Sequence, residues 1–153
     1  MPTSKNYLLD VNCWLAAAAR RHRHHPEAKN WLDAAAAALI FCRVTQMAFL
    51  RLVTNPKVMG VDVLTPRQAW EIYRKFRADP RILFAEEPPE LEKAWLEITD
   101  ASGFKQNLWT DSYLAAFAKA GGHTIVTFDD GFKQFSEIDA IILQAKPEPE
   151  KSL

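Results

Sequence analysis

One stretch decides the fold of this chain: residues 109–131, WTDSYLAAFAKAGGHTIVTFDDG. We expect Thr110 to be the N-terminal cap of a helix in which apolar residues recur at helical spacing. Gly121-Gly122 predicts its left-handed C-terminal cap, because glycine adopts positive φ without steric cost. The β-branched run 124–127 then predicts a strand that leads into two carboxylates. A helix that feeds a strand in this way is typical of an α/β domain.

The same alternation extends toward both ends of the chain. Further short apolar runs predict strands at residues 7–9, 39–41, 82–84 and 140–143. The segments between them predict helices near residues 14–19, 26–39, 45–54, 66–79 and 91–98. We therefore expect a single α/β domain over residues 1–146, with a mostly parallel central sheet of about five strands covered by helices on both faces. Residues 147–153 predict a flexible C-terminal tail.

Composition limits the class of protein. The chain has 153 residues, with 19 basic and 19 acidic side chains, which suits one compact domain and argues against binding polyanions through overall charge. The longest apolar stretch, residues 34–42, is too short to cross a membrane, and the N-terminus lacks a signal-peptide core. We therefore expect a cytoplasmic protein. Two cysteines, Cys13 and Cys42, are too few for a disulfide framework, so we expect both to be small buried side chains.

The candidate functional residues lie where predicted strands end, because ligands of parallel α/β sheets bind at the carboxyl ends of strands. Asp10 follows the first strand, and Asp129 follows the strand 124–127 with one residue between them. Asp111 lies in the first turn of the preceding helix. Each acid alone could be a helix cap or a partner of a helix dipole. Together they would repel one another unless a cation neutralised them, which predicts a site for a hard divalent ion such as Mg²⁺.

Five segments together carry a resemblance to a known family. They lie at residues 8–12, 22–32, 44–56, 109–118 and 127–132. In order and spacing they resemble the PIN-domain ribonucleases of the VapC toxin type, over residues 7–143. The most specific pair is Thr-Asp-Ser-Tyr-Leu at 110–114 with Thr-Phe-Asp at 127–129.

The resemblance implies a metal-dependent endoribonuclease, the toxin of a type II toxin–antitoxin system, that cuts a structured RNA with Mg²⁺ or Mn²⁺. It also implies a homodimer and a small cognate antitoxin. We expect the inhibitory segment of that antitoxin to be basic, because a cation in the acidic pocket would replace the charge of the metal.

The resemblance assigns roles to individual residues. Asp10, Asp111 and Asp129 match the acidic metal ligands of the family. The family usually has a glutamate where this chain has Gln46, whose neutral amide offers an oxygen without a charge. We therefore expect weaker metal binding than in a site with four carboxylates.

Other residues could support the site. Asn12 and Thr110 match positions that orient the carboxylates by hydrogen bonds, or else cap helices. Asp130, beside Asp129, could add a carboxylate. Basic side chains on the rim could contact RNA phosphates, and the candidates are Arg20, Arg21, Arg23, Arg43 and Arg51.

Two motifs invite interpretations that we weigh against simpler ones. Residues 22–25 carry three histidines without a cysteine or a fourth ligand, so we expect a solvated loop rather than a zinc site. The tryptophans suggest base stacking. Trp31 and Trp70, however, lie on the apolar faces of predicted helices, so we expect both in the core. For Trp109, just before Thr110, base stacking and a core position are both left as alternatives.

Two alternatives stand beside the toxin. The first is a catalytically weak PIN-like module that binds RNA or an antitoxin, a hypothesis that Gln46 favours. The second is a phosphoesterase of another doubly wound fold, which needs an Asp-Xaa-Asp arrangement, whereas residue 12 is asparagine. Metal-dependent RNA cleavage, with Asp10→Asn as the control, separates the first alternative from the enzyme.

Overall fold

A computed structural model describes residues 6–101 and 103–144, which form a five-stranded sheet flanked by helices. The strands are β1 (Asn6–Leu9), β2 (Ala38–Phe41), β3 (Ile82–Phe84), β4 (Thr124–Thr127) and β5 (Ala140–Ile142). Their order is β3-β2-β1-β4-β5, and each pair of neighbours is parallel. The predicted α/β class and the sheet of five strands are confirmed. The tail expected over residues 147–153 lies outside the described residues.

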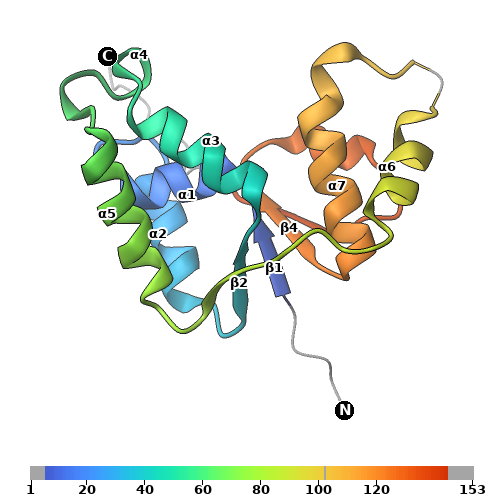
Figure 1. The fold of residues 1–153 in the computed structure, drawn as a ribbon, viewed down its shortest axis with the longest axis horizontal. Coiled ribbons are helices and arrows are strands. Elements are labelled where there is room, and N and C mark those ends of the chain that lie inside the picture. The colour runs from blue at the N-terminus through green and yellow to red at the C-terminus, as the bar shows by residue number, and fades with distance from the viewer. Residues whose placement is uncertain (1–5, 102, 145–153) are drawn as a thin grey trace, which may run out of the picture.

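The helices cover both faces of the sheet (Figure 1). They are α1 (Val11–Ala18), α2 (His25–Ala34), α3 (Arg43–Val53), α4 (Pro56–Met59), α5 (Pro66–Arg77), α6 (Leu91–Thr99) and α7 (Trp109–Gly121), with short 3-10 turns at Gly60–Asp62, Gln106–Leu108 and Asp130–Gln134. In Figure 1, helices α1, α2, α3 and α5 lie on one side of the molecule and α6 and α7 on the other. None of the helices within the described ranges is long and apolar enough to cross a membrane.

The core divides into two hydrophobic clusters. Leu8 and Leu9, successive residues of β1, belong to different clusters, as side chains that alternate across a strand must. The end of β1 is therefore buried on both faces of the sheet, as expected of an apolar run in a parallel sheet. Cys13 and Cys42 are both buried and free, one in each cluster, which confirms their prediction as small buried side chains.

Most helix ends follow their sequence signals. Thr65 forms a capping box at the start of α5, and Gly122, with φ 70°, ends α7 in the left-handed conformation. The prediction that Thr110 caps α7 is wrong. The helix begins at Trp109, because the 3-10 turn Gln106–Leu108 runs directly into it.

One predicted core position is also wrong. Trp70 is 42% exposed on α5, whose buried positions are Ala69 and Tyr73. Trp31 packs edge-on against Tyr7 beside the core, close to its predicted position. The apolar stripe of α5 is therefore wider than the surface that its neighbours cover.

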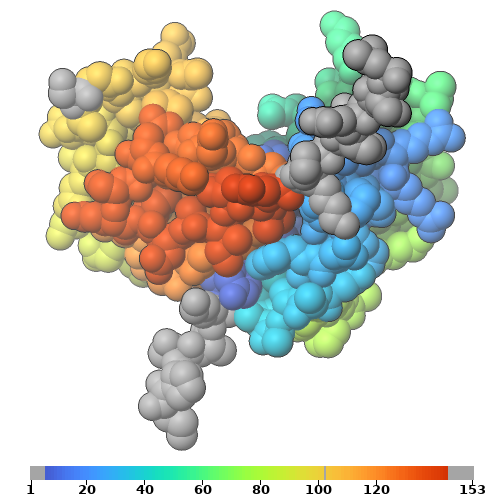
Figure 2. Space-filling model, turned by 180° about the vertical axis from the view of Figure 1, so that it is seen from behind, coloured from blue at the N-terminus to red at the C-terminus, as the bar shows by residue number. Residues whose placement is uncertain are grey.

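The carboxyl ends of the parallel strands lie together at one edge of the sheet. In Figure 1 the arrow of β1 points toward the side of the molecule on which α3 and α7 lie. Figure 2 shows the surface from behind, notched between the side formed by α6 and α7 and the side formed by α3 and α4.

Candidate active site

Asp10 follows β1 directly and caps α1. Its Oδ1 accepts a hydrogen bond from the backbone N–H of Val11 at 2.7 Å. Its Oδ2 accepts from the hydroxyl of Thr127 at 2.9 Å and lies 3.4 Å from Nδ2 of Asn12. The residue is only 8% exposed. Asp10 therefore caps α1, as the sequence allowed, and its carboxylate also belongs to the candidate site.

Thr127 joins the ends of the two central strands. It is the last residue of β4 and is fully buried. Its hydroxyl donates to Asp10, and it accepts from Nδ2 of Asn12 at 3.2 Å and from the backbone N–H of Asp129 at 3.0 Å. A hydroxyl has one donor and two acceptor positions, so the hydrogen-bonding capacity of Thr127 is fully used. The sequence analysis missed this residue, although a hydroxyl at a strand end before an acid was an available signal.

Asp129 is held by the turn that follows it. Its Oδ1 accepts from the backbone N–H of Gly131 at 2.8 Å. A Cβ on Gly131 would lie 3.0 Å from that same oxygen, so the glycine permits a close approach. Asn12 supports the loop from α1, because its Oδ1 accepts from the backbone N–H of Phe128 at 3.3 Å. Asn12 thus contacts the acid-bearing ends of both β1 and β4.

Asp111 reaches the same region from the first turn of α7. Burial, together with the negative charges of Asp10 and Asp129, raises the pKa of Asp111 to about 6. Burial also raises the pKa of Asp10, with the charge of Asp129 adding to it, while the hydrogen bonds from Thr127 and Val11 act in the opposite direction. The structure thus brings the three predicted acids into one electrostatic cluster, which we call the acidic cluster.

Among the residues that the structure describes, no basic side chain forms an ion pair with the acidic cluster. In residues 6–101 and 103–144, none of the ion pairs involves Asp10, Asp111 or Asp129. Nor do any three histidine, cysteine, aspartate or glutamate side chains of these residues form a group that could hold a metal ion as they stand. Mg²⁺ takes only one or two protein carboxylates and completes its shell with water and phosphate oxygens. An open cluster of hard oxygen donors without a protein cation fits that ion.

Gln46 has another partner. It is buried on α3, and its Oε1 accepts a hydrogen bond from Nη1 of Arg43 at 2.6 Å. The guanidinium of Arg43 also lies 4.7 Å from the ring centroid of Phe84 in β3. Because arginine can only donate, the amide oxygen of Gln46 must face Arg43. The amide oxygen of Gln46, which the sequence suggests as a possible metal ligand, therefore already accepts a hydrogen bond from Arg43.

Two predicted supporting residues do not join the acidic cluster. Thr110 and Asp130 are both exposed. Within the part of the chain that the structure describes, no hydrogen bond links either side chain to the three acids. Asp130 instead lines a separate hollow with His24 and Lys133.

The predicted basic rim divides into two groups. The first lies in the turn before α2 and consists of Arg20, Arg21 and Arg23, and the second lies on α3 and consists of Arg43 and Arg51. Arg21 forms an ion pair of 3.6 Å with Asp62, and both side chains remain largely open to solvent. Arg43 is engaged with Gln46 and Phe84, and Arg51 is exposed in the last turn of α3.

The histidines of the turn before α2 are half-buried, while its arginines are exposed as expected of a solvated loop. The ring of His24 stacks on Phe128 with centroids 4.7 Å apart and an interplanar angle of 16°. Nδ1 of His22 accepts from the backbone N–H of His24 at 3.0 Å, and Nδ1 of His25 lies 2.8 Å from the carbonyl oxygen of Ala16. The turn thus packs against the residue before Asp129, and local hydrogen bonds engage Nδ1 of His22 and of His25, whereas Nδ1 of His24 is buried without a hydrogen-bond partner among the described residues.

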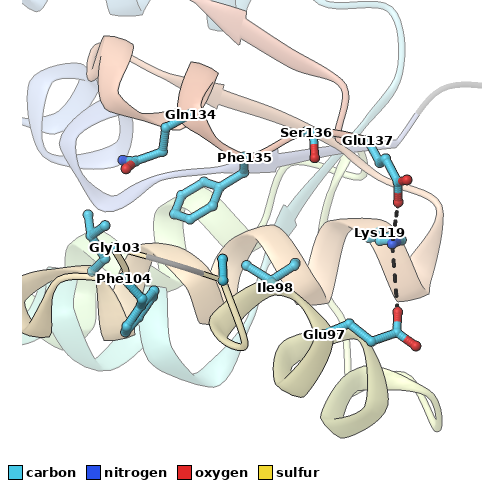
Figure 3. Close-up of a pocket in the computed structure, with 11 residues that line it drawn as sticks. Glu97, Ile98, Gly103, Phe104, Lys119, Gln134, Phe135, Ser136 and Glu137 are labelled. Carbon is cyan, nitrogen blue, oxygen red and sulfur yellow. Dashed lines mark hydrogen bonds and ion pairs between the residues drawn. The ribbon is translucent and has the colours of Figure 1, made fainter.

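A cavity of about 460 Å³ lies elsewhere, between α6, α7 and the segment after β4 (Figure 3). Lys119 forms ion pairs there with Glu137 at 2.8 Å and with Glu97 at 4.0 Å. The side chains of Ile98 and Phe135 face the same space. None of the described residues that line this cavity belongs to the acidic cluster. Its ion pairs tie α6 and α7 to the segment after β4.

Comparison with known proteins agrees with this geometry. Residues 7–138 match the PIN domain family. Ribonuclease VapC41 of Mycobacterium tuberculosis is 42% identical over 142 residues, which cover 89% of this chain and 97% of that protein. The chain therefore belongs to the PIN-domain family, with VapC ribonucleases among its relatives. The resemblance inferred from the sequence is confirmed, and a phosphoesterase of another fold is excluded.

Solved structures show the same fold. The chain superposes on VapC20 of Mycobacterium tuberculosis, described as a Sarcin-Ricin loop cleaving toxin, with a TM-score of 0.64 and 16% identity, over 88% of this chain and 99% of that one. VapBC2 from Rickettsia felis gives a TM-score of 0.64 and 16% identity, over 90% and 98% of the two chains. At this identity the likeness concerns the fold alone.

Proposed function

We propose that this protein is a metal-dependent endoribonuclease and the toxin of a toxin–antitoxin pair. Its relative with 42% identity is named a ribonuclease, and ribonucleases of this family generally depend on divalent metal ions. The observation that carries the proposal is the acidic cluster, in which burial and the charge of Asp129 raise the pKa of Asp10 and of Asp111, and in which none of the ion pairs of the described residues supplies a cation. We propose Mg²⁺ or Mn²⁺ as the ion that these residues hold.

The ion, when bound, would activate a water molecule and stabilise the leaving oxygen of a phosphodiester. The chain itself positions the carboxylates. Thr127 and Asn12 orient Oδ2 of Asp10 from β4 and α1. The backbone N–H of Gly131 engages Oδ1 of Asp129, so the other oxygen of that carboxylate faces no competing hydrogen bond among the described residues. The carboxylates of Asp10 and Asp129 are therefore held in place before a ligand arrives, which favours catalysis by positioning.

The partners follow from the same site. RNA is the substrate, and a small antitoxin is the inhibitor, a partner that the VapBC complexes among the structural neighbours support. A carboxylate cluster without a protein cation suits an arginine or lysine of the inhibitor. We propose that both encounters take place in the cytoplasm, where such an enzyme meets its RNA. A homodimer is proposed on the family resemblance.

A cleavage assay tests the proposal. The purified protein is incubated with labelled cellular RNA in the presence of Mg²⁺, Mn²⁺ or a chelator. We expect cleavage by the parental protein only when metal is present, and none by Asp10→Asn. A parental protein that binds RNA but cuts none at any metal concentration would favour the alternative, a catalytically weak binding module. Recovery of the protein without a small partner when it is co-expressed with its neighbouring gene would count against the toxin.

A further inference from the structure

The charges of this neutral chain are divided between its two halves. Residues 1–81 contain 13 of the 19 basic side chains, among them every arginine, whereas residues 82–153 contain 13 of the 19 acidic side chains. Helices α1, α2, α3 and α5 belong to the first half and α6 and α7 to the second, and the two groups lie on opposite sides of the molecule in Figure 1. An RNA strand that reaches the acidic cluster is therefore attracted to the side of α3 and α5.

Two arginines on that side meet at one aromatic ring. The guanidinium carbon of Arg43, at the start of α3, lies 4.7 Å from the ring centroid of Phe84. That of Arg77, at the end of α5, lies 6.0 Å from the same centroid and 5.9 Å from the ring centroid of Tyr73. We call Arg43 and Arg77 the arginine pair. The aromatic rings hold both guanidiniums in place while leaving their edges open to a ligand.

Within the described part of the chain, no carboxylate forms an ion pair with Arg43 or Arg77. Both residues are exposed, and each guanidinium makes one hydrogen bond there, to the amide of Gln46 and to the hydroxyl of Tyr73 respectively. A guanidinium carries five N–H groups, so most of these donors remain for a ligand. Two positive charges held at one ring without a carboxylate favour an anion, and the guanidinium edge matches a phosphate.

Two acidic residues lie close to one of the arginines. Glu86 and Glu87 follow β3 and line a hollow of about 370 Å³ together with Arg43. Neither forms an ion pair with Arg43, and Glu87 instead accepts a hydrogen bond from the hydroxyl of Tyr113 at 2.7 Å. These carboxylates repel a phosphate, so we expect an RNA backbone to lie on the side of the arginine pair that faces α3 and α5.

The register of the sheet relates the arginine pair to the acidic cluster. The last residues of β2 and β3, Phe41 and Phe84, are partners, and so are the residues before the last in β1 and β2. Phe84 is therefore level with Leu9, which directly precedes Asp10. Two strand spacings, about 10 Å, separate the two positions. An RNA strand that crosses this edge of the sheet thus reaches the arginine pair within a few nucleotides of the acidic cluster.

We propose that Arg43 and Arg77 bind the phosphate backbone of the RNA substrate a few nucleotides from the scissile bond, on the β3 side of the acidic cluster. The inference rests on the proposed function and adds the direction in which the substrate leaves the site. Arg77 lies outside the basic rim expected from the sequence. Phosphate contacts position a strand without reading its bases. An acidic segment of the antitoxin is the competing ligand, and the test separates the two.

Binding without metal measures phosphate contacts apart from cleavage. Fluorescein-labelled dodecamers of adenosine and of uridine ribonucleotides are titrated with protein in EDTA at a series of KCl concentrations and followed by fluorescence anisotropy. We expect Arg43→Gln and Arg77→Gln each to weaken binding of both dodecamers roughly 5- to 30-fold at low salt. Each should also reduce the slope of log Kd against the logarithm of the salt concentration by about 0.7, the value for one phosphate contact with a single strand.

Arg67→Gln is the matched control, because it removes an exposed arginine from the first turn of α5, and it should lose far less affinity. Arg77→Gln leaves the contact between Arg43 and Gln46 intact, so its effect is independent of residue 46. Arg77→Lys should keep the salt dependence, since it keeps the charge, but lose part of the affinity with the planar fork. Thermal unfolding verifies that each variant is folded.

Parental affinity of the folded Arg43→Gln and Arg77→Gln variants would overturn the proposal. An equal loss in Arg67→Gln would do the same, because it would indicate a general effect of net charge. Unchanged RNA binding with weakened retention of the co-expressed antitoxin would assign the arginine pair to the protein partner instead.

The failure of this inference and that of the proposed function are distinguishable. A parental protein that cuts RNA, together with arginine variants that bind both dodecamers normally, would overturn the phosphate site alone. A parental protein that binds RNA through the arginine pair but cuts none at any metal concentration would overturn the nuclease alone. A parental protein that binds neither dodecamer and cuts no RNA would overturn both.

Discussion

Arg43 donates a 2.6 Å hydrogen bond to the side-chain oxygen of Gln46, three residues further along α3. The same guanidinium lies over the ring of Phe84, which anchors it at the end of β3. The position that departs from the glutamate usual in this family is thus engaged by a cation from its own helix. From the sequence alone, a glutamate at position 46 is expected to strengthen the metal site. The Arg43 contact changes that expectation.

Gln46→Glu is expected to change the affinity for Mn²⁺ by less than about threefold, because the new carboxylate would pair with Arg43. In an Arg43→Ala background the same substitution should tighten Mn²⁺ binding roughly tenfold. Isothermal titration calorimetry on the four proteins of this cycle measures the coupling. Met47→Glu, at an exposed neighbouring position, is the control for added charge. A full gain in the single variant would mean that residue 46 faces the metal and that Arg43 does not restrain it.

Asp10→Asn, Asp111→Asn and Asp129→Asn are each expected to reduce metal-dependent RNA cleavage to background while the fold survives. Each change removes one charge from a cluster of like charges, which relieves repulsion but withdraws a ligand. Asp130→Asn is the control, since Asp130 is exposed and directly follows Asp129. Cleavage rates on labelled RNA, with circular dichroism as the check on folding, test this prediction. Parental rates in the three variants would refute the assignment.

Asp111→Asn is expected to stabilise the metal-free protein at neutral pH. Below about pH 4 the Asp111 carboxyl is protonated in the folded and unfolded states and costs nothing. As the pH rises through the folded-state pKa of about 6, the folded protein must ionise a partly buried group near two negative charges, so stability falls between roughly pH 4 and pH 6 and stays lower above that range.

The predicted gain for Asp111→Asn at pH 7.5 is about 1 kcal/mol, because solvent screens a half-buried group, and this corresponds to a Tm increase of about 2–4 °C. Thermal unfolding in EDTA at pH 4 and pH 7.5 measures it, and the difference should be much smaller at the lower pH. Saturating Mn²⁺ should raise the Tm of the parent more than that of the variant. A gain that is equal at both pH values would show that the charge of Asp111 is not its source.

Thr127→Val is expected to destabilise the protein by roughly 1–3 kcal/mol, since it removes the hydrogen bonds of a buried hydroxyl to Asp10, to Asn12 and to the backbone N–H of Asp129. It should also raise the pKa of Asp10, because the lost hydrogen bond holds that pKa down, and so move the acidic limb of the pH–rate profile to higher pH. Urea unfolding and the profile measure the two effects. Thr124→Val, at the other end of β4, is the control. Unchanged stability and an unchanged profile would exclude Thr127 as a positioning residue.

The sequence by itself determined the parallel sheet and the edge on which Asp10 and Asp129 lie. Both follow from local rules, because buried parallel strands are continuous apolar runs and the residue after such a strand falls on the carboxyl edge. It also determined the C-terminal end of α7, where Gly122 adopts a φ that other residues rarely reach.

Only the tertiary structure decided how these acids are held. The hydroxyl of Thr127 meets Asp10 across 117 positions of sequence, a contact that exists because β1 and β4 are neighbours in the sheet. The exposure of Trp70 also could not be predicted from the sequence, because the apolar stripe of a helix does not determine how much of its surface the neighbouring helices cover. Gln46 is a third example. The sequence shows that residue 46 is a glutamine, but the orientation of its amide depends on the position of the Arg43 guanidinium, which packs against Phe84. Periodicity and strand ends are local properties, whereas hydrogen-bond partners and burial depend on which segments the fold brings together.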